Sequence, residues 1–175
     1  MFAALVENRI AAAERETGAN ADWMRDLYRA APALAFKFAR FLPLSRHRRA
    51  ASREALAVTH LVAVLAEDCG PCVQIAVNLS LKAGVDPALL RAVIEDRAAD
   101  LGPELEAVHD YARAVATGAP DAGDRAEALR ERLGAAAAAE LAMSVATARV
   151  FPALKRGLGH GLACSQVTIE VPGDG

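Results

Sequence analysis

Residues 54–66 are the segment that most constrains what this chain can fold into. The segment has the length of a helix, and its large apolar residues are spread around the whole helix axis. They are Leu56, Val58, Leu61, Val62, Val64 and Leu65. A helix without a polar face is normally buried on all sides. The sequence therefore predicts a buried helix over these residues.

The neighbouring segments carry helix boundaries of a recurring kind. Pro71, Pro87 and Pro103 each stand where a new apolar pattern begins, and proline is favoured in the first turn of a helix. Gly84 and Gly118 stand where two of these patterns end, as glycine often does after a helix. Alanine and leucine, the best helix formers, are plentiful, and no convincing strand pattern is visible. These features predict an all-α bundle of about eight helical segments.

We interpret the whole chain, residues 1–175, as a single domain. Residues 1–48 are expected to form an N-terminal helical extension, and residues 49–152 the core. Residues 153–175 are expected to form a C-terminal helix and tail, with the last helical segment over residues 160–167. A chain of this length can bury its own core.

Charge and hydropathy exclude several classes of protein. The net charge is −2 and there is no basic block, so nucleic acid is not expected as a partner. The most apolar stretches, residues 56–66 and 135–150, are short or carry Glu140 and Arg149, so no membrane span is expected. The N-terminus lacks a basic start and an unbroken apolar run, which argues against a signal peptide. We therefore expect a cytoplasmic protein.

Two of the three cysteines form a Cys-x-x-Cys motif, Cys69 and Cys72, with Pro71 between them. In the cytoplasm such a pair is more often catalytic or metal-binding than structural. If Pro71 lies in the first turn of a helix, Cys69 is its N-cap, where the helix dipole favours a thiolate. We expect Cys69 to attack a substrate and Cys72, one turn on, to close the disulfide, although these roles can be reversed.

Two further side chains are candidates for moving the proton of the thiol. Glu67 precedes the motif, and its charge either opposes thiolate formation or, with a raised pKa, accepts the proton. His60 lies seven residues before Glu67, so the two would share a face of one helix. The hypothesis is that Glu67 is the proton acceptor and that His60 assists it.

The stretch REALAVTHLVAVLAEDCGPCVQIAVNLSLKAGVDPALLRAVI resembles the carboxymuconolactone decarboxylase and alkylhydroperoxidase D-like family, in which a buried helix leads into a CxxC at the start of the next helix. The later stretch EALRERLGAAAAAELAMSVATARVF is similar to the C-terminal half of that family. Together the resemblance covers residues 49–152. The relay histidine and glutamate of the family fall on Ala76 and Ala57, so those two positions are not matched.

The resemblance implies an alkylhydroperoxidase D-like helical bundle that forms a homo-oligomer. Members that carry the CxxC are thiol-dependent peroxidases or disulfide reductases without a bound cofactor. The substrate implied is a small hydroperoxide or disulfide, and the reductant is a dithiol protein of peroxiredoxin or lipoyl type. Disulfide exchange needs only the two sulfurs, so the missing relay bears mainly on hydroperoxide reduction.

Two other readings remain open at this point. Cys69, Cys72, His160 and Cys164 would make a Cys₃His set suitable for tetrahedral zinc, if the fold brought them together. Alternatively, the protein is a non-catalytic helical oligomer.

The remaining aromatic and histidine residues are expected to be structural. Trp23 and the phenylalanines near it are expected in the core or in an oligomer interface rather than in a ligand pocket. His109 is expected on a helix surface or partly buried.

Overall fold

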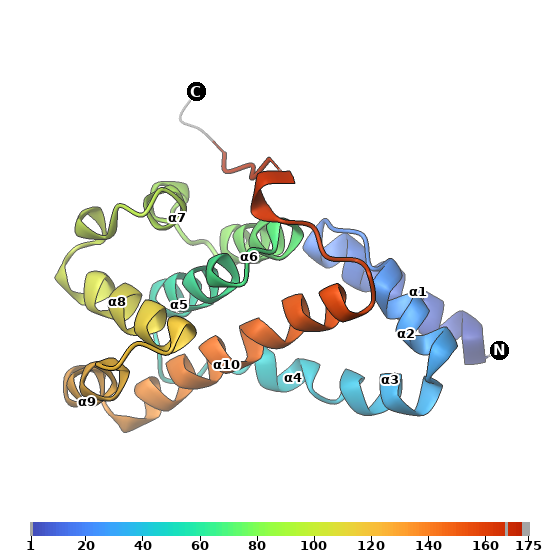
Figure 1. Cartoon of the computed structure of the whole chain (residues 1–175), viewed down its shortest axis with the longest axis horizontal. Helices are drawn as coiled ribbons and strands as arrows, with labels where there is room; N and C mark the ends of the chain where they lie inside the picture. The colour runs from blue at the N-terminus through green and yellow to red at the C-terminus, as the bar shows by residue number, and fades with distance from the viewer. Residues whose placement is uncertain (1, 167, 173–175) are drawn as a thin grey trace.

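A computed structural model describes residues 2–166 and 168–172, and these residues form an all-α protein without strands, as predicted (Figure 1). Two short 3₁₀ helices, Ala98–Leu101 and Cys164–Gln166, accompany the α-helices of this part of the chain. The α-helices are α1 (Phe2–Thr17), α2 (Asp22–Ala30), α3 (Pro32–Ala39), α4 (Leu42–Ser45), α5 (Arg53–Ala66), α6 (Gly70–Lys82), α7 (Pro87–Ile94), α8 (Pro103–Thr117), α9 (Ala122–Leu133) and α10 (Ala135–Gly157).

Helix α5 is buried at the centre of the bundle, and its burial confirms the prediction made from its apolar pattern. It contacts α6, α7, α8 and α10, and these helices enclose it on several sides (Figure 1). Val58, Leu61 and Val64 on α5 are fully buried. Ser52 caps its N-terminus by accepting a hydrogen bond from the Ala55 N–H at 3.1 Å.

The predicted helix boundaries are also confirmed. Pro71, Pro87 and Pro103 lie in the first turns of α6, α7 and α8. Gly84 and Gly118 follow the ends of α6 and α8 with φ angles of +80° and +69°, a conformation that strains other residues. Proline at helix starts and glycine after helix ends therefore divide the core as the sequence indicated.

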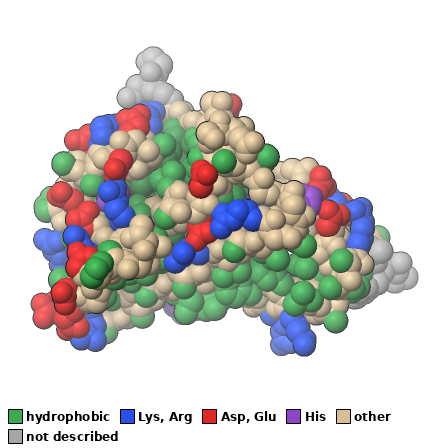
Figure 2. All heavy atoms as spheres, in the orientation of Figure 1, with side chains coloured by type: hydrophobic (Ala, Val, Ile, Leu, Met, Phe, Trp, Pro, Cys, Tyr) green, Lys and Arg blue, Asp and Glu red, His purple; other side chains and the backbone are tan. Residues whose placement is uncertain are grey.

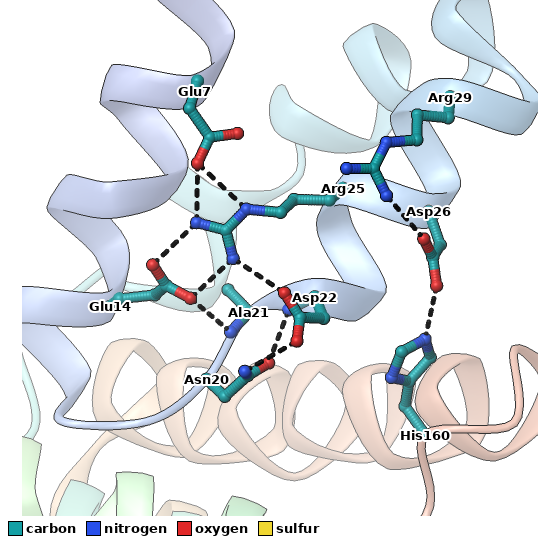
Figure 3. Close-up of polar contacts among 9 residues, drawn as sticks. All are labelled: Glu7, Glu14, Asn20, Ala21, Asp22, Arg25, Asp26, Arg29 and His160. Atoms are coloured by element: carbon teal, nitrogen blue, oxygen red, sulfur yellow. Dashed lines mark hydrogen bonds and ion pairs between the residues drawn. The ribbon is translucent and has the colours of Figure 1, made fainter.

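The N-terminal extension, helices α1–α4, packs against the core rather than standing apart from it. Helix α1 contacts α6, and α4 contacts α10. Arg25 joins α1 to α2 because its guanidinium binds the carboxylates of Glu7, Glu14 and Asp22 at 2.7–3.0 Å (Figure 3). The side-chain amide of Asn78 on α6 donates to the Thr17 carbonyl at 2.8 Å, which fastens the end of α1 to the core.

The basic linker between α4 and α5 is held by one carboxylate of α10. Glu140 accepts hydrogen bonds from the backbone N–H groups of Arg49, Ala50 and Ala51 at 2.8–3.1 Å. The bonds from Ala51 and Ala50 hold the pKa of Glu140 below its usual value. Glu140 thus fixes the linker where the extension joins the core.

The expected helix over residues 160–167 is wrong for the part that the structure describes. Helix α10 stops because Gly159 takes a left-handed conformation (φ +80°), and the His160 N–H then bonds back to the Lys155 carbonyl at 2.8 Å. Beyond this point only Cys164–Gln166 is helical, as one 3₁₀ turn, and Val167 lies outside the described residues.

Residues 158–166 and 168–172, called here the C-terminal strap, cross the start of α6 (Figure 1). The Gly70 N–H donates to the Leu162 carbonyl at 3.0 Å. Further along, the side-chain amide of Gln74 both donates to and accepts from the backbone of Glu170, at 3.0 and 2.7 Å. The strap therefore covers the turn that carries Cys69.

By length and composition alone, helix α10 is long and apolar enough to cross a membrane, although no membrane span was expected from the sequence. In the fold it packs on α5, α8 and α9, and Leu141, Val145 and Ala148 are buried there. Hydrophobic side chains also gather along the lower edge of the molecule, over α3, α4 and α10 (Figure 2). The exposed large hydrophobic residues of these helices are Leu34, Phe36, Leu44, Met143 and Val150.

His109 is fully buried, with 2% of its surface exposed, whereas a surface or partly buried position was expected. It follows Leu105 by four residues and precedes Ala112 by three, so it belongs to the stripe that α8 turns toward α5. Its Nδ1 atom has no hydrogen-bond partner among the described residues.

Candidate functional site: a disulfide beside an apolar cavity

Cys69 and Cys72 form a disulfide at the start of α6, with their Cα atoms 5.2 Å apart. Cys69 is the N-cap residue, as predicted, and its carbonyl accepts hydrogen bonds from the N–H groups of Cys72 and Val73, both at 2.9 Å. Only 2% of Cys69 and 5% of Cys72 are exposed. The helix start thus holds the two sulfurs together in a dry environment.

A cavity of about 190 Å³ lies between the N-terminal extension and helices α5, α6 and α10. We call it the interhelical cavity. Cys72 is among the residues that line it, whereas Cys69 is not. Most of its wall is apolar, and the larger apolar residues include Trp23, Met24, Ile75, Leu79 and Phe151. Of the two cysteines, Cys72 is therefore the one that borders space for a small molecule.

His60 projects from α5 into the same cavity. Burial lowers the pKa of His60 to about 4, and the positive charge of Arg48 acts in the same direction. The imidazole is therefore neutral at pH 7, and the lone pair of its unprotonated nitrogen can accept a hydrogen bond. The sequence hypothesis placed His60 near the CxxC, and in the fold His60 and Cys72 line the same cavity.

Glu67 has a different environment from the one predicted. Helix α5 ends at Ala66, and Glu67 binds Arg149 and Arg156 of α10 at 2.7 and 2.5 Å instead of lining the cavity with His60. Burial acts to raise its pKa, but the hydrogen bonds from Arg156 and Arg149 outweigh burial and lower the pKa below its usual value. The expectation of a raised pKa is wrong, because two guanidinium groups stabilise the charged form.

We expect Glu67→Gln to alter the anchoring of the CxxC turn and not its proton chemistry. The melting temperature should fall by a few degrees, since both ion pairs to α10 are lost. The midpoint of the pH profile for alkylation of the reduced cysteines should stay in place. Glu104→Gln, an exposed change on α8, is the matched control. A shifted alkylation midpoint in Glu67→Gln alone would restore Glu67 as the proton acceptor.

Lys155 is the residue of the site that sequence reasoning missed. It lies on α10 with 4% of its surface exposed, it lines the cavity, and its ammonium group sits 5.8 Å from the centre of the Trp23 ring. Burial lowers its pKa to about 8. One signal was available: Lys155 continues the buried stripe of α10 after Ala148 and Pro152, at helical spacing.

The zinc set does not assemble. His160 pairs with Asp26 of α2 at 2.8 Å (Figure 3), and Cys164 lies by Asp68. Burial, and then the hydrogen bond and charge of Asp68, raise the pKa of the Cys164 thiol. Residues 2–166 and 168–172 contain no group of three or more His, Cys, Asp or Glu side chains placed to hold a metal ion.

The chain matches no protein-family model, no curated protein and no solved structure. The resemblance to the alkylhydroperoxidase D-like family therefore stays a prediction from the CxxC and its helical surroundings. What the fold adds to that prediction is the all-α class, the disulfide and the cavity beside it.

Proposed function

We propose that this protein is a thiol-dependent oxidoreductase of the alkylhydroperoxidase D-like kind, with Cys69 and Cys72 as its redox dithiol. One observation carries the proposal: the disulfide lies at a helix N-terminus and presents Cys72 to an apolar cavity that also holds the neutral imidazole of His60. A helix N-terminus favours a thiolate, and a neutral imidazole in the same cavity can accept a hydrogen bond from a thiol.

The cavity favours Cys72 as the attacking sulfur, which reverses the roles expected from the sequence. With a hydroperoxide, the Cys72 thiolate attacks one oxygen, the O–O bond breaks, and an alcohol leaves after protonation. The Cys69 thiol then displaces water from the sulfenic acid and closes the disulfide. With a disulfide substrate, two exchange steps release two thiols and end at the same Cys69–Cys72 bond. In both cases the dithiol loses two electrons.

The partners belong to the proposal as well. A dithiol reductant protein, of peroxiredoxin or lipoyl type by the resemblance, would return two electrons and two protons to the disulfide. A cytoplasmic location is part of the same proposal, since the cycle needs a reducing compartment. The exposed apolar residues of α3, α4 and α10 support a homo-oligomer.

The first test is the intact mass of the reduced protein before and after mild peroxide. A loss of two hydrogens, mapped to Cys69 and Cys72, is expected, followed by turnover with a dithiol reductant. Cys164→Ser should behave as wild type, because Cys164 is not part of the disulfide. An unchanged mass after peroxide and after a small disulfide oxidant would refute the redox proposal.

The two single-cysteine variants test which sulfur attacks. In a Cys164→Ser background, Cys69→Ser should accumulate a mixed disulfide on Cys72 when treated with a small disulfide, because no second thiol then remains to resolve it. Cys72→Ser should form this adduct at least tenfold more slowly, since Cys69 does not reach the cavity. Both variants should lack turnover. Faster adduct formation at Cys69 would return the attacking role to that residue.

A further inference from the structure

The wall of the interhelical cavity contains Lys155, a largely buried lysine without an anion beside it. Among the described residues, the ammonium group of Lys155 has no hydrogen-bond or ion-pair partner, and it lies over the ring of Trp23. An attraction between a cation and an aromatic face is weaker than a charge-assisted hydrogen bond. A lysine side chain with this little exposure is normally paired, so Lys155 indicates a site for a group from outside the chain.

The carboxylates near Lys155 are already engaged elsewhere. Glu140 is the acidic residue of the cavity wall, but it lies 15 residues up α10, about 22 Å away along the helix, and is saturated by the linker. On α2, Asp22 binds Arg25, and Asp26 binds Arg29 and His160 (Figure 3). On α5, His60 is neutral, and on α6, Cys72 is in the disulfide.

The rest of the cavity is suited to an apolar body. Trp23, Ile75 and Phe151 contribute large apolar surfaces to its wall. An apolar cavity of roughly 150 Å³ can hold benzene, so a volume of about 190 Å³ accommodates a short hydrocarbon chain. Burial of such a chain is favourable in proportion to its apolar area.

We propose that the interhelical cavity binds an aliphatic carboxylate, with its head group on Lys155 and its chain along Trp23, Ile75 and Phe151. The end of α10 that carries Lys155 also packs by the CxxC, because the neighbouring Arg156 binds Glu67 just before that motif. If the proposed function holds, the substrate is an aliphatic carboxylate whose hydroperoxide or disulfide group lies beside Cys72.

Trp23 is the only tryptophan of the chain, so its fluorescence reports on the cavity directly. Octanoate should change the Trp23 fluorescence of the oxidised protein in a saturable way. 1-Octanol and octylamine should bind at least tenfold more weakly than octanoate. Lys155→Met keeps the length of the side chain without its charge. This variant should bind octanoate at least tenfold more weakly than wild type and should bind 1-octanol with unchanged affinity. Lys37→Met, an exposed change on α3, is the matched control.

Three results would overturn the site: no saturable binding of octanoate, equal affinity for octanoate and 1-octanol, or full octanoate affinity in Lys155→Met. The last result would place the carboxylate on an exposed arginine of the rim such as Arg48. Octanoate has no group that the cysteines can reduce, so its binding is independent of the redox proposal. Octanoate binding without redox turnover would refute the proposed enzyme activity and support the carboxylate site. Redox turnover without octanoate binding would support the activity and refute the site.

Discussion

Lys155→Met is expected to stabilise the ligand-free protein at pH 7 by about 2 kcal/mol. Burial lowers the pKa of Lys155 from 10.5 to about 8, which corresponds to a cost of about 3 kcal/mol for keeping the ammonium charged in the fold. Loss of the contact with Trp23 offsets about 1 kcal/mol of the gain. Thermal unfolding should show a melting temperature higher by about 5 °C.

The effect of Lys155→Met should depend on pH. Between pH 8 and pH 10.5 the unfolded wild-type chain binds a proton at this lysine that the folded protein does not, so wild-type stability rises with pH in that window. The extra stability of Lys155→Met over wild type is therefore complete below pH 8 and becomes smaller above pH 8. A gain that stays constant to pH 10.5 would show that packing, not charge burial, is its cause. Lys37→Met again serves as the exposed control.

The wild-type protein is expected to lose about 3 kcal/mol of stability between pH 6.5 and pH 4 through His60 alone. Burial and the charge of Arg48 lower the pKa of His60 from 6.5 to about 4, so in this window the unfolded chain binds a proton that the folded protein excludes. Chemical denaturation along a pH series should show the loss in wild type and not in His60→Gln.

Carboxylates such as Glu14 and Glu140 also lose favourable hydrogen bonds in acid, in wild type and variant alike. The informative quantity is therefore the difference in the free energy of unfolding between wild type and variant. That difference should grow toward pH 4 in favour of His60→Gln. His47→Gln, which changes a half-exposed histidine paired with Glu140, should change the profile much less than His60→Gln does. Parallel profiles for His60→Gln and wild type would mean that the imidazole is not enclosed by the cavity.

The fold was predictable where a local signal decides it. The apolar residues around α5, the prolines at the starts of α6 and α7 and the glycine after α6 act through short-range sterics and burial, and each is visible in sequence. The C-terminal strap was not predictable in the same way. Its path depends on hydrogen bonds between Gly70 and Leu162 and between Gln74 and Glu170, which are almost a hundred residues apart.

The site was predictable in its sulfurs but not in its charges. Cys69 at a helix N-cap followed from the position of Pro71. The partners of Glu67 come from two turns of α10, and no spacing in the sequence relates Arg149 or Arg156 to the CxxC. Lys155 looked like one of several basic residues at the end of a helix. Only the docking of α2 against α10 makes it a buried cation.

The C-terminal strap gives the two sulfurs of one bond separate routes to the outside. Cys72 communicates with the interhelical cavity, whereas Cys69 lies under backbone that hydrogen-bonds across the turn into α6. In the reduced protein, a reagent too large for the cavity reaches Cys69 only while the strap is detached. The rate at which such a reagent labels Cys69 then measures the free energy of that local opening rather than the reactivity of the thiol. The labelling rates of two maleimides of different size would therefore report on two different motions of the same protein.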